Sequence, residues 1–459
     1  MPIIPRTAIA LAVAAFTSAA LVSSPQAAEV KVEADLGHSV LATSDPGSVY
    51  LRLSLKSLAA GKRARRTPVN AAIVIDRSGS MHGDRIAAAK EGARVALERL
   101  SSDDTVALVA YNHNVDVLSP AAPLGGSRDR LKRAINQLSA GGTTALYDGV
   151  KEGGRQLESF LSDNNVNRVV LLSDGLANVG PSSPRELATL GRKLASRGIT
   201  VSTIGLGLDY NEDLMQRLAA ASDGNHVFVE RPSDLAEIFD REFGDALSVS
   251  ARDITITIEC KLGFRPVRIL GRDGSIDGDR ITLKLNQLQA ENERYVVVEL
   301  KAPKDQDGGR SEGIADIADV RVDYVDLDKD AAPAHVEARA NVRFSKNDKD
   351  VEGGINKAVM SQVAAQIATE TSEKAVVLRD RGDIKGARKV LEDNAAYVKE
   401  AYEQYGSGAN AAPTTSLGML NELEKQNREA AANLDEKSWS RTRKAMRYDQ
   451  HKAKVQQSY

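Results

Sequence analysis

Short apolar runs alternate with stretches of helical periodicity between residues 69 and 246. Residues 69–75, 105–111, 168–173 and 200–206 are apolar enough to be strands buried on both faces. Between the first two, residues 85–100 place Ile86, Ala89, Ala93 and Leu97 on one helix face. A further strand at 115–118 follows 105–111 so closely that this pair should be antiparallel. The alternation predicts an α/β fold with a doubly wound, mostly parallel sheet and helices on both faces.

From residue 249 to residue 345 the hydrophobic pattern changes to a period of two. Alternating strands are predicted at 253–259, 280–285, 294–300, 318–324 and 335–342, as in an antiparallel β-sandwich. Residues 29–66 hold two more strand candidates, 30–34 and 49–57, which are too few to form a stable unit alone. We therefore expect them to complete the later sheet, so that residues 68–246 are inserted in, or flanked by, a β-sandwich.

Residues 352–459 return to helical periodicity and predict an α-helical C-terminal region. Three helices are expected, at about 355–381, 384–405 and 417–454. The last stretch is basic between residues 437 and 454. We expect a solvated helix face there; docking to an acidic partner is the alternative.

Oxygen-bearing side chains follow the strand at 69–75. Asp76, Ser78 and Ser80 stand directly after it, and Asp174 ends the strand that begins near residue 168. A glycine pair, Gly141 and Gly142, precedes two threonines at the start of another predicted helix. In open α/β sheets, ligands bind at the carboxyl ends of the strands. Hydroxyl and carboxylate oxygens suit a hard cation such as Mg²⁺ better than Zn²⁺.

These three loops resemble the metal-ion-dependent adhesion site of the von Willebrand factor type A family. That site combines an Asp-x-Ser-x-Ser motif with a threonine in the second loop and an aspartate in the third. The resemblance covers about residues 68–245, and it implies a Rossmann-like domain whose metal ligands are Asp76, Ser78, Ser80, Thr144 and Asp174. Thr143 is the alternative second-loop ligand; we expect Thr144 because Ala145 and the residues after it then keep the family's helix start.

The resemblance also implies a function. We expect a divalent-metal-dependent module for protein binding, adhesion or assembly, holding Mg²⁺ with Mn²⁺ or Ca²⁺ as alternatives. A protein ligand would offer an Asp or Glu carboxylate to complete the coordination.

The first 28 residues have the composition of a secretory signal peptide. Arg6 precedes the small-apolar run of residues 8–22, and small residues follow at 25–28. The apolar run is shorter than the roughly 20 residues that a membrane span needs, which disfavours an anchor. We therefore expect an exported protein, periplasmic or secreted to the cell surface, with no integral membrane segment in the mature chain.

Composition argues against a nucleic-acid partner and rules out an intramolecular disulfide. The 61 basic and 63 acidic residues nearly balance and aromatic residues make up only 4%, so we expect no nucleic-acid partner. The single cysteine, Cys260, cannot form an intramolecular disulfide, and we expect a packed thiol on the strand face opposite the neighbouring isoleucines.

We expect no enzyme, because no Ser-His-Asp arrangement or zinc-ligand spacing is present. Two alternatives remain open: a structural scaffold with a non-essential metal site, and a metallohydrolase. The second would use His82 or, less well placed, His113 as its base.

Overall fold

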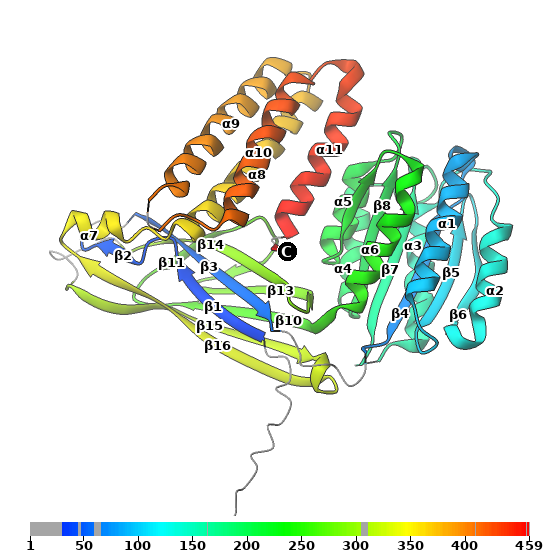
Figure 1. The fold of residues 1–459 in the computed structure, drawn as a ribbon, viewed down its shortest axis with the longest axis horizontal. Coiled ribbons are helices and arrows are strands. Elements are labelled where there is room, and N and C mark those ends of the chain that lie inside the picture. Colours follow the sequence, from blue (N-terminus) through cyan, green and yellow to red (C-terminus); the bar gives the residue numbers. More distant parts are fainter. Residues whose placement is uncertain are drawn as a thin grey trace, which may run out of the picture.

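The computed structural model describes residues 30–44, 47–58, 66–162, 164–303, 311–408, 410–455 and 457–458. An α/β domain lies at one end of the molecule, a region of two β-sheets lies at the other, and a group of long helices rests above the sheets (Figure 1). The predicted signal peptide at residues 1–28 lies outside the described residues.

The α/β domain is built on a six-stranded sheet in the order β6-β5-β4-β7-β8-β9. Only the β5–β6 pair is antiparallel, as predicted, and the other neighbours are parallel. The strands are β4 (Val69–Asp76), β5 (Thr105–Tyr111), β6 (Val115–Pro123), β7 (Val166–Ser173), β8 (Ile199–Leu206) and β9 (His226–Val229). The helices are α1 (Asp84–Arg99), α2 (Leu124–Gln137), α3 (Leu146–Leu157), α4 (Pro184–Ala195), α5 (Glu212–Ala221) and α6 (Leu235–Leu247).

Helices cover both faces of this sheet because the side chains of β4 alternate between two cores. Ile73 and Ile75 pack with residues of α1, α2 and α6, whereas Ala72 and Val74 pack with residues of α3, α4 and α5. The predicted doubly wound α/β arrangement is confirmed.

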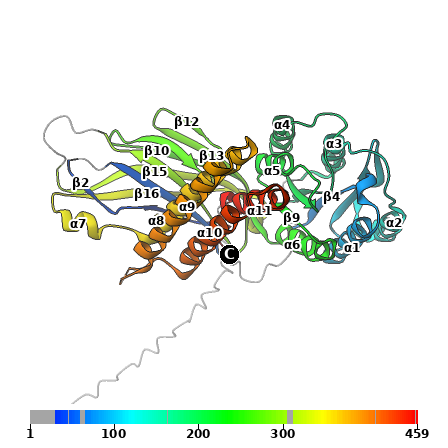
Figure 2. The same cartoon turned by 90° about the horizontal axis from the view of Figure 1, so that it is seen from above.

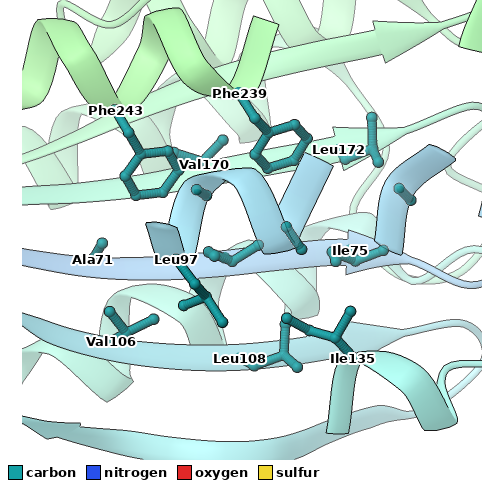
Figure 3. Packing of buried hydrophobic residues seen from close by; sticks show 14 of the residues in the cluster. Ala71, Ile75, Leu97, Val106, Leu108, Ile135, Val170, Leu172, Phe239 and Phe243 are labelled. Carbon is teal, nitrogen blue, oxygen red and sulfur yellow. The ribbon is translucent and has the colours of Figure 1, made fainter. Parts of the chain in front are cut away.

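Aromatic side chains of α6 fill one face of the domain core. Phe239 and Phe243 stack with ring centroids 6.5 Å apart, and they lie over Val170 and Leu172 of the sheet (Figure 3). A Cβ atom on Gly92 of α1 would lie 2.6 Å from Phe239 Cδ2. The absence of a side chain at Gly92 therefore allows α1 and α6 to approach closely.

The remaining strands form two sheets that share one hydrophobic core. One sheet has the order β1-β3-β14-β11, with β17 also paired to β14; the other has the order β12-β13-β10-β15-β16-β2. Strand β3, which precedes the α/β domain, pairs antiparallel with β14, which follows it. The bounds are β1 (Val30–Leu36), β2 (Val40–Ala42), β3 (Ser48–Ser57), β10 (Val249–Cys260), β11 (Arg265–Leu270), β12 (Ser275–Asp277), β13 (Arg280–Gln289), β14 (Glu293–Lys301), β15 (Gly313–Asp326), β16 (Ala332–Ser345) and β17 (Gln457–Ser458).

Cys260 is buried with a free thiol in this shared core. The expectation that it lies opposite the isoleucines of β10 is wrong. Residues two apart along a strand share a face, so Cys260 lies on the same side as Ile254, Ile256 and Ile258.

The C-terminal region is helical, as predicted, but its last predicted helix is two helices. Asp435 accepts hydrogen bonds from the N–H groups of Lys437 and Ser438 at 3.0 and 3.1 Å, and a new helix begins there. The helices are α7 (Asp348–Gly353), α8 (Lys357–Asp380), α9 (Ile384–Gly406), α10 (Thr414–Ala432) and α11 (Glu436–Val455). Seen from above, α11 lies between the other long helices and the α/β domain (Figure 2). Within the described ranges, no helix is both long and apolar enough to cross a membrane.

Candidate metal centre

The first loop of the candidate site is fixed by hydrogen bonds to Asp76. Strand β4 is buried along its whole length, and Asp76 at its carboxyl end is fully buried. Its Oδ1 accepts a hydrogen bond from the Ser78 N–H at 2.8 Å, and its Oδ2 accepts one from the Ser173 hydroxyl at 2.6 Å. Because Ser173 ends the neighbouring parallel strand β7, the carboxylate links the ends of both strands.

Three hydroxyl groups gather beside the third loop. Ser78 Oγ and Ser80 Oγ lie 3.1 Å apart. A Cβ atom on Gly175 would lie 3.2 Å from Ser80 Oγ, 3.4 Å from Thr144 Oγ1 and 3.8 Å from Ser78 Oγ. Side chains from two loops separated by more than sixty residues therefore surround one point.

Of the two adjacent threonines, Thr144 is the one that faces this cluster. Its side chain is buried, whereas Thr143 is exposed. The Thr144 N–H donates to Asn178 Oδ1 at 2.8 Å, and the Asn178 N–H donates to the Thr144 carbonyl at 3.2 Å. These two bonds tie the second loop to the third.

The fifth predicted residue, Asp174, is also buried at this edge. Its Oδ1 accepts a hydrogen bond from Ser80 Oγ at 2.6 Å. Its Oδ2 accepts one from Arg85 Nη1, also at 2.6 Å, so the carboxylate is already paired with a cation of the protein. The structure thus brings all five predicted residues to one place and adds Arg85, which the sequence pattern did not indicate.

Burial makes the Asp76 carboxyl group costly to ionise. Burial raises the pKa of Asp76 to about 6, above its usual value of 3.8, and the nearby Asp174 raises it further, while hydrogen bonds from Ser173 and Ser78 oppose the shift. The ionised carboxylate is therefore costly in this environment unless a positive charge lies close by.

The donor set fits a hard divalent cation. Two carboxylates and three hydroxyls are available, and all are oxygen ligands of the kind that Mg²⁺ prefers. In the part of the chain that the structure describes, no three His, Cys, Asp or Glu side chains gather into a metal-binding group. A cation held here would consequently depend on the serine and threonine hydroxyls.

The two histidines considered as bases are both exposed. His113 packs against the second loop, where a Cβ on Gly142 would lie 2.5 Å from its Nδ1. Gly142 has a φ of 87°, a conformation open to glycine, and the lack of a side chain makes room for the ring. The contact gives His113 a role in shaping the loop.

The domain is an open, mostly parallel α/β sheet with polar loops gathered at its carboxyl edge, the edge where ligands bind in sheets of this kind. Within that class, residues 70–241 match the family model described as the von Willebrand factor type A domain, and this part of the chain is such a domain.

Similar curated proteins include "Uncharacterized protein YfbK" of Escherichia coli (strain K12). It is 28% identical over 210 residues, which are 45% of this chain and 36% of that protein. The human inter-alpha-trypsin inhibitor heavy chain H4 is 27% identical over 177 residues, which are 37% of this chain and 19% of that protein. The chain thus matches well under half the length of either relative.

Two solved structures share the fold over most of the chain. A von Willebrand factor type A protein from Catenulispora acidiphila has a TM-score of 0.67 at 18% identity and covers 88% of this chain and 97% of its own. The ArnB paralog VWA2 from Sulfolobus acidocaldarius has a TM-score of 0.58 at 16% identity, and the match covers 93% of this chain and 97% of that protein.

Proposed function

We propose that the α/β domain is a divalent-metal-dependent protein-binding module of an exported protein. The observation that carries this proposal is the convergence of the Ser78, Ser80 and Thr144 hydroxyls within 3.8 Å of one point beside Gly175. The signal-peptide composition of residues 1–28 supports export to the periplasm or the cell surface.

The residues of this chain would hold Mg²⁺ through three neutral hydroxyls and the two carboxylates of Asp76 and Asp174. The hydroxyls carry no charge, and Arg85 already balances part of the charge on Asp174. Mg²⁺ bound in such a set supplies an electrophilic centre, and an Asp or Glu carboxylate of a partner can complete its coordination. The Ser78 N–H and the Ser173 hydroxyl hold the Asp76 carboxylate in one orientation, so this donor is pre-organised.

The adjacent threonines provide a matched pair of variants for testing this proposal. After dialysis against EDTA, the wild type and Thr143→Ala should bind Mg²⁺ equally in isothermal titration calorimetry. Thr144→Ala should bind at least tenfold more weakly, because it loses a buried hydroxyl of the cluster. Equal affinities for the two variants, or no Mg²⁺ binding by the wild type, would rule the proposal out.

Partner binding needs a separate measurement. Immobilised wild type in Mg²⁺ should capture a protein that Asp76→Ala does not capture and that EDTA releases. Capture that is insensitive to EDTA would contradict metal-dependent binding.

A structural scaffold is the second candidate function. It is favoured by the Arg85–Asp174 ion pair, which neutralises one of the two site carboxylates without any metal. On this alternative, Asp76→Ala keeps its partners and its biological role.

A further inference from the structure

The basic face of α11 is docked on acidic residues of the same chain. Arg443 pairs with Glu212, with Asp213 at 2.5 Å and with Asp380 at 2.9 Å. The Lys444 ammonium is buried and lies 2.6 Å from Glu212 Oε2. The expected solvated face is therefore wrong for Arg443 and Lys444. Their acidic partners are residues of α5 and of the end of α8 in the same chain, not of a separate protein.

The same helix holds the loop between β8 and α5, residues 207–211. Ser440 Oγ donates to the Leu208 carbonyl at 3.3 Å, and Lys444 Nζ donates to the Tyr210 carbonyl at 2.9 Å. The Lys444 ammonium also lies 4.6 Å from the centre of the Tyr210 ring. That ring packs directly on Gly205, so the loop is fixed between the end of β8 and α11.

On its other side, this loop reaches the candidate metal centre. Asp209 Oδ2 accepts a hydrogen bond from Arg85 Nη2 at 3.3 Å, while Arg85 Nη1 donates to Asp174 at 2.6 Å. The Arg85 side chain also packs on Gly207, whose added Cβ would lie 3.1 Å from Arg85 Nη2. One guanidinium therefore bridges the loop that α11 holds and a carboxylate of the site.

We infer that docking of α11 regulates the metal centre through loop 207–211 and Arg85. This inference rests on the proposed function for its effect on metal affinity. A divalent cation near Asp174 repels the guanidinium and competes for the same carboxylate, so Arg85 shifts toward Asp209. With α11 docked, Asp209 stays within reach and the shift is easier. Docking therefore raises metal affinity, and by linkage metal binding strengthens docking to the same extent.

The structural half of the inference is tested without metal by amide hydrogen exchange in EDTA. Arg85→Gln removes the bridge, and residues 440–447 of α11 should exchange at least threefold faster than in the wild type. Asp209→Asn, which changes an exposed side chain, should have the same effect. Arg94→Gln is the control, because its exposed guanidinium on the same helix pairs with Glu91, away from the site. Unchanged exchange in both test variants would overturn the inference.

The functional half is tested by Mg²⁺ titration of full-length variants of α11. Lys444→Gln, which weakens the hold on the loop, should reduce Mg²⁺ affinity about three- to tenfold, and Ser440→Ala should reduce it in the same direction. Lys454→Gln is the matched control, since this ammonium pairs with Glu373 of α8 at the other end of α11, and its affinity should stay within twofold of the wild type. Equal affinities for Lys444→Gln and Lys454→Gln would overturn regulation by α11. If the wild type binds no Mg²⁺, the proposed function fails, while the exchange measurement still decides whether Arg85 couples the site edge to α11.

Discussion

Replacing Gly175 by alanine probes the hydroxyl cluster without changing any of its oxygens. The added methyl group would lie 3.2 Å from Ser80 Oγ and 3.4 Å from Thr144 Oγ1. The contact with Ser80 is tighter than an ordinary van der Waals contact, so this hydroxyl must move by a few tenths of an ångström. Mg²⁺ holds oxygen ligands at about 2.0–2.1 Å in near-ideal octahedral geometry, and metal sites tolerate errors of about 0.2 Å. The displacement is as large as this tolerance.

We therefore expect Gly175→Ala to weaken Mg²⁺ binding at least tenfold, or about 1.4 kcal/mol, by isothermal titration calorimetry. The loss of folding stability should stay below about 1 kcal/mol in EDTA, because the atom that moves is the end of an exposed side chain. Gly141→Ala is the control in the second loop, since its Cβ would meet no heavy atom within 4 Å. Wild-type affinity in Gly175→Ala, or an equal loss in both variants, would refute the reasoning.

Three further predictions concern stability. Burial raises the pKa of Asp76 to about 6, so in EDTA the wild type loses stability as pH rises from about 4 to 6. At pH 7.5, Asp76→Asn should therefore be about 2–3 kcal/mol more stable than the wild type by urea denaturation. Equal stabilities of the two proteins would contradict this prediction. Gly92→Ala places a methyl group 2.6 Å from a ring carbon of Phe239 and should lower folding stability by about 1–3 kcal/mol in thermal denaturation. An unchanged melting temperature would show that α1 and α6 separate freely. Burial beside β9 lowers the pKa of His451 to about 4, so folding stability falls by up to about 3 kcal/mol as pH falls from about 6.5 to 4. His451→Gln should flatten this dependence of stability on pH. The same pH dependence in the variant as in the wild type would contradict this prediction.

The parts of the fold that the sequence predicts well are those with a strong local period. Strand β4 and its neighbours are long apolar runs, and the acids and serines of the first and third loops follow strand ends directly. Parallel register then places those ends at one edge of the sheet. For this reason the sequence alone predicts that Asp76 and Asp174 lie close together.

Other features depend on tertiary contacts that local patterns do not contain. The bridge from Arg85 to Asp174 joins residues 89 positions apart and is set by the packing of α1. Thr143 and Thr144 are identical neighbours, and in the fold one is exposed whereas the other is buried beside the hydroxyl cluster. The helical period continues through residues 433–435, so the break before α11 depends on capping by Asp435. The basic face of α11 finds its acidic partners more than two hundred residues away, on α5.

Anomalous diffraction from crystals soaked in Mn²⁺ tests the central claim most directly. We expect one strong manganese peak within coordination distance of the Ser78, Ser80 and Thr144 hydroxyls, and loss of that peak in Asp76→Ala crystals. No peak at saturating Mn²⁺, or a peak away from these hydroxyls, would contradict a metal-dependent binding site at this edge of the sheet.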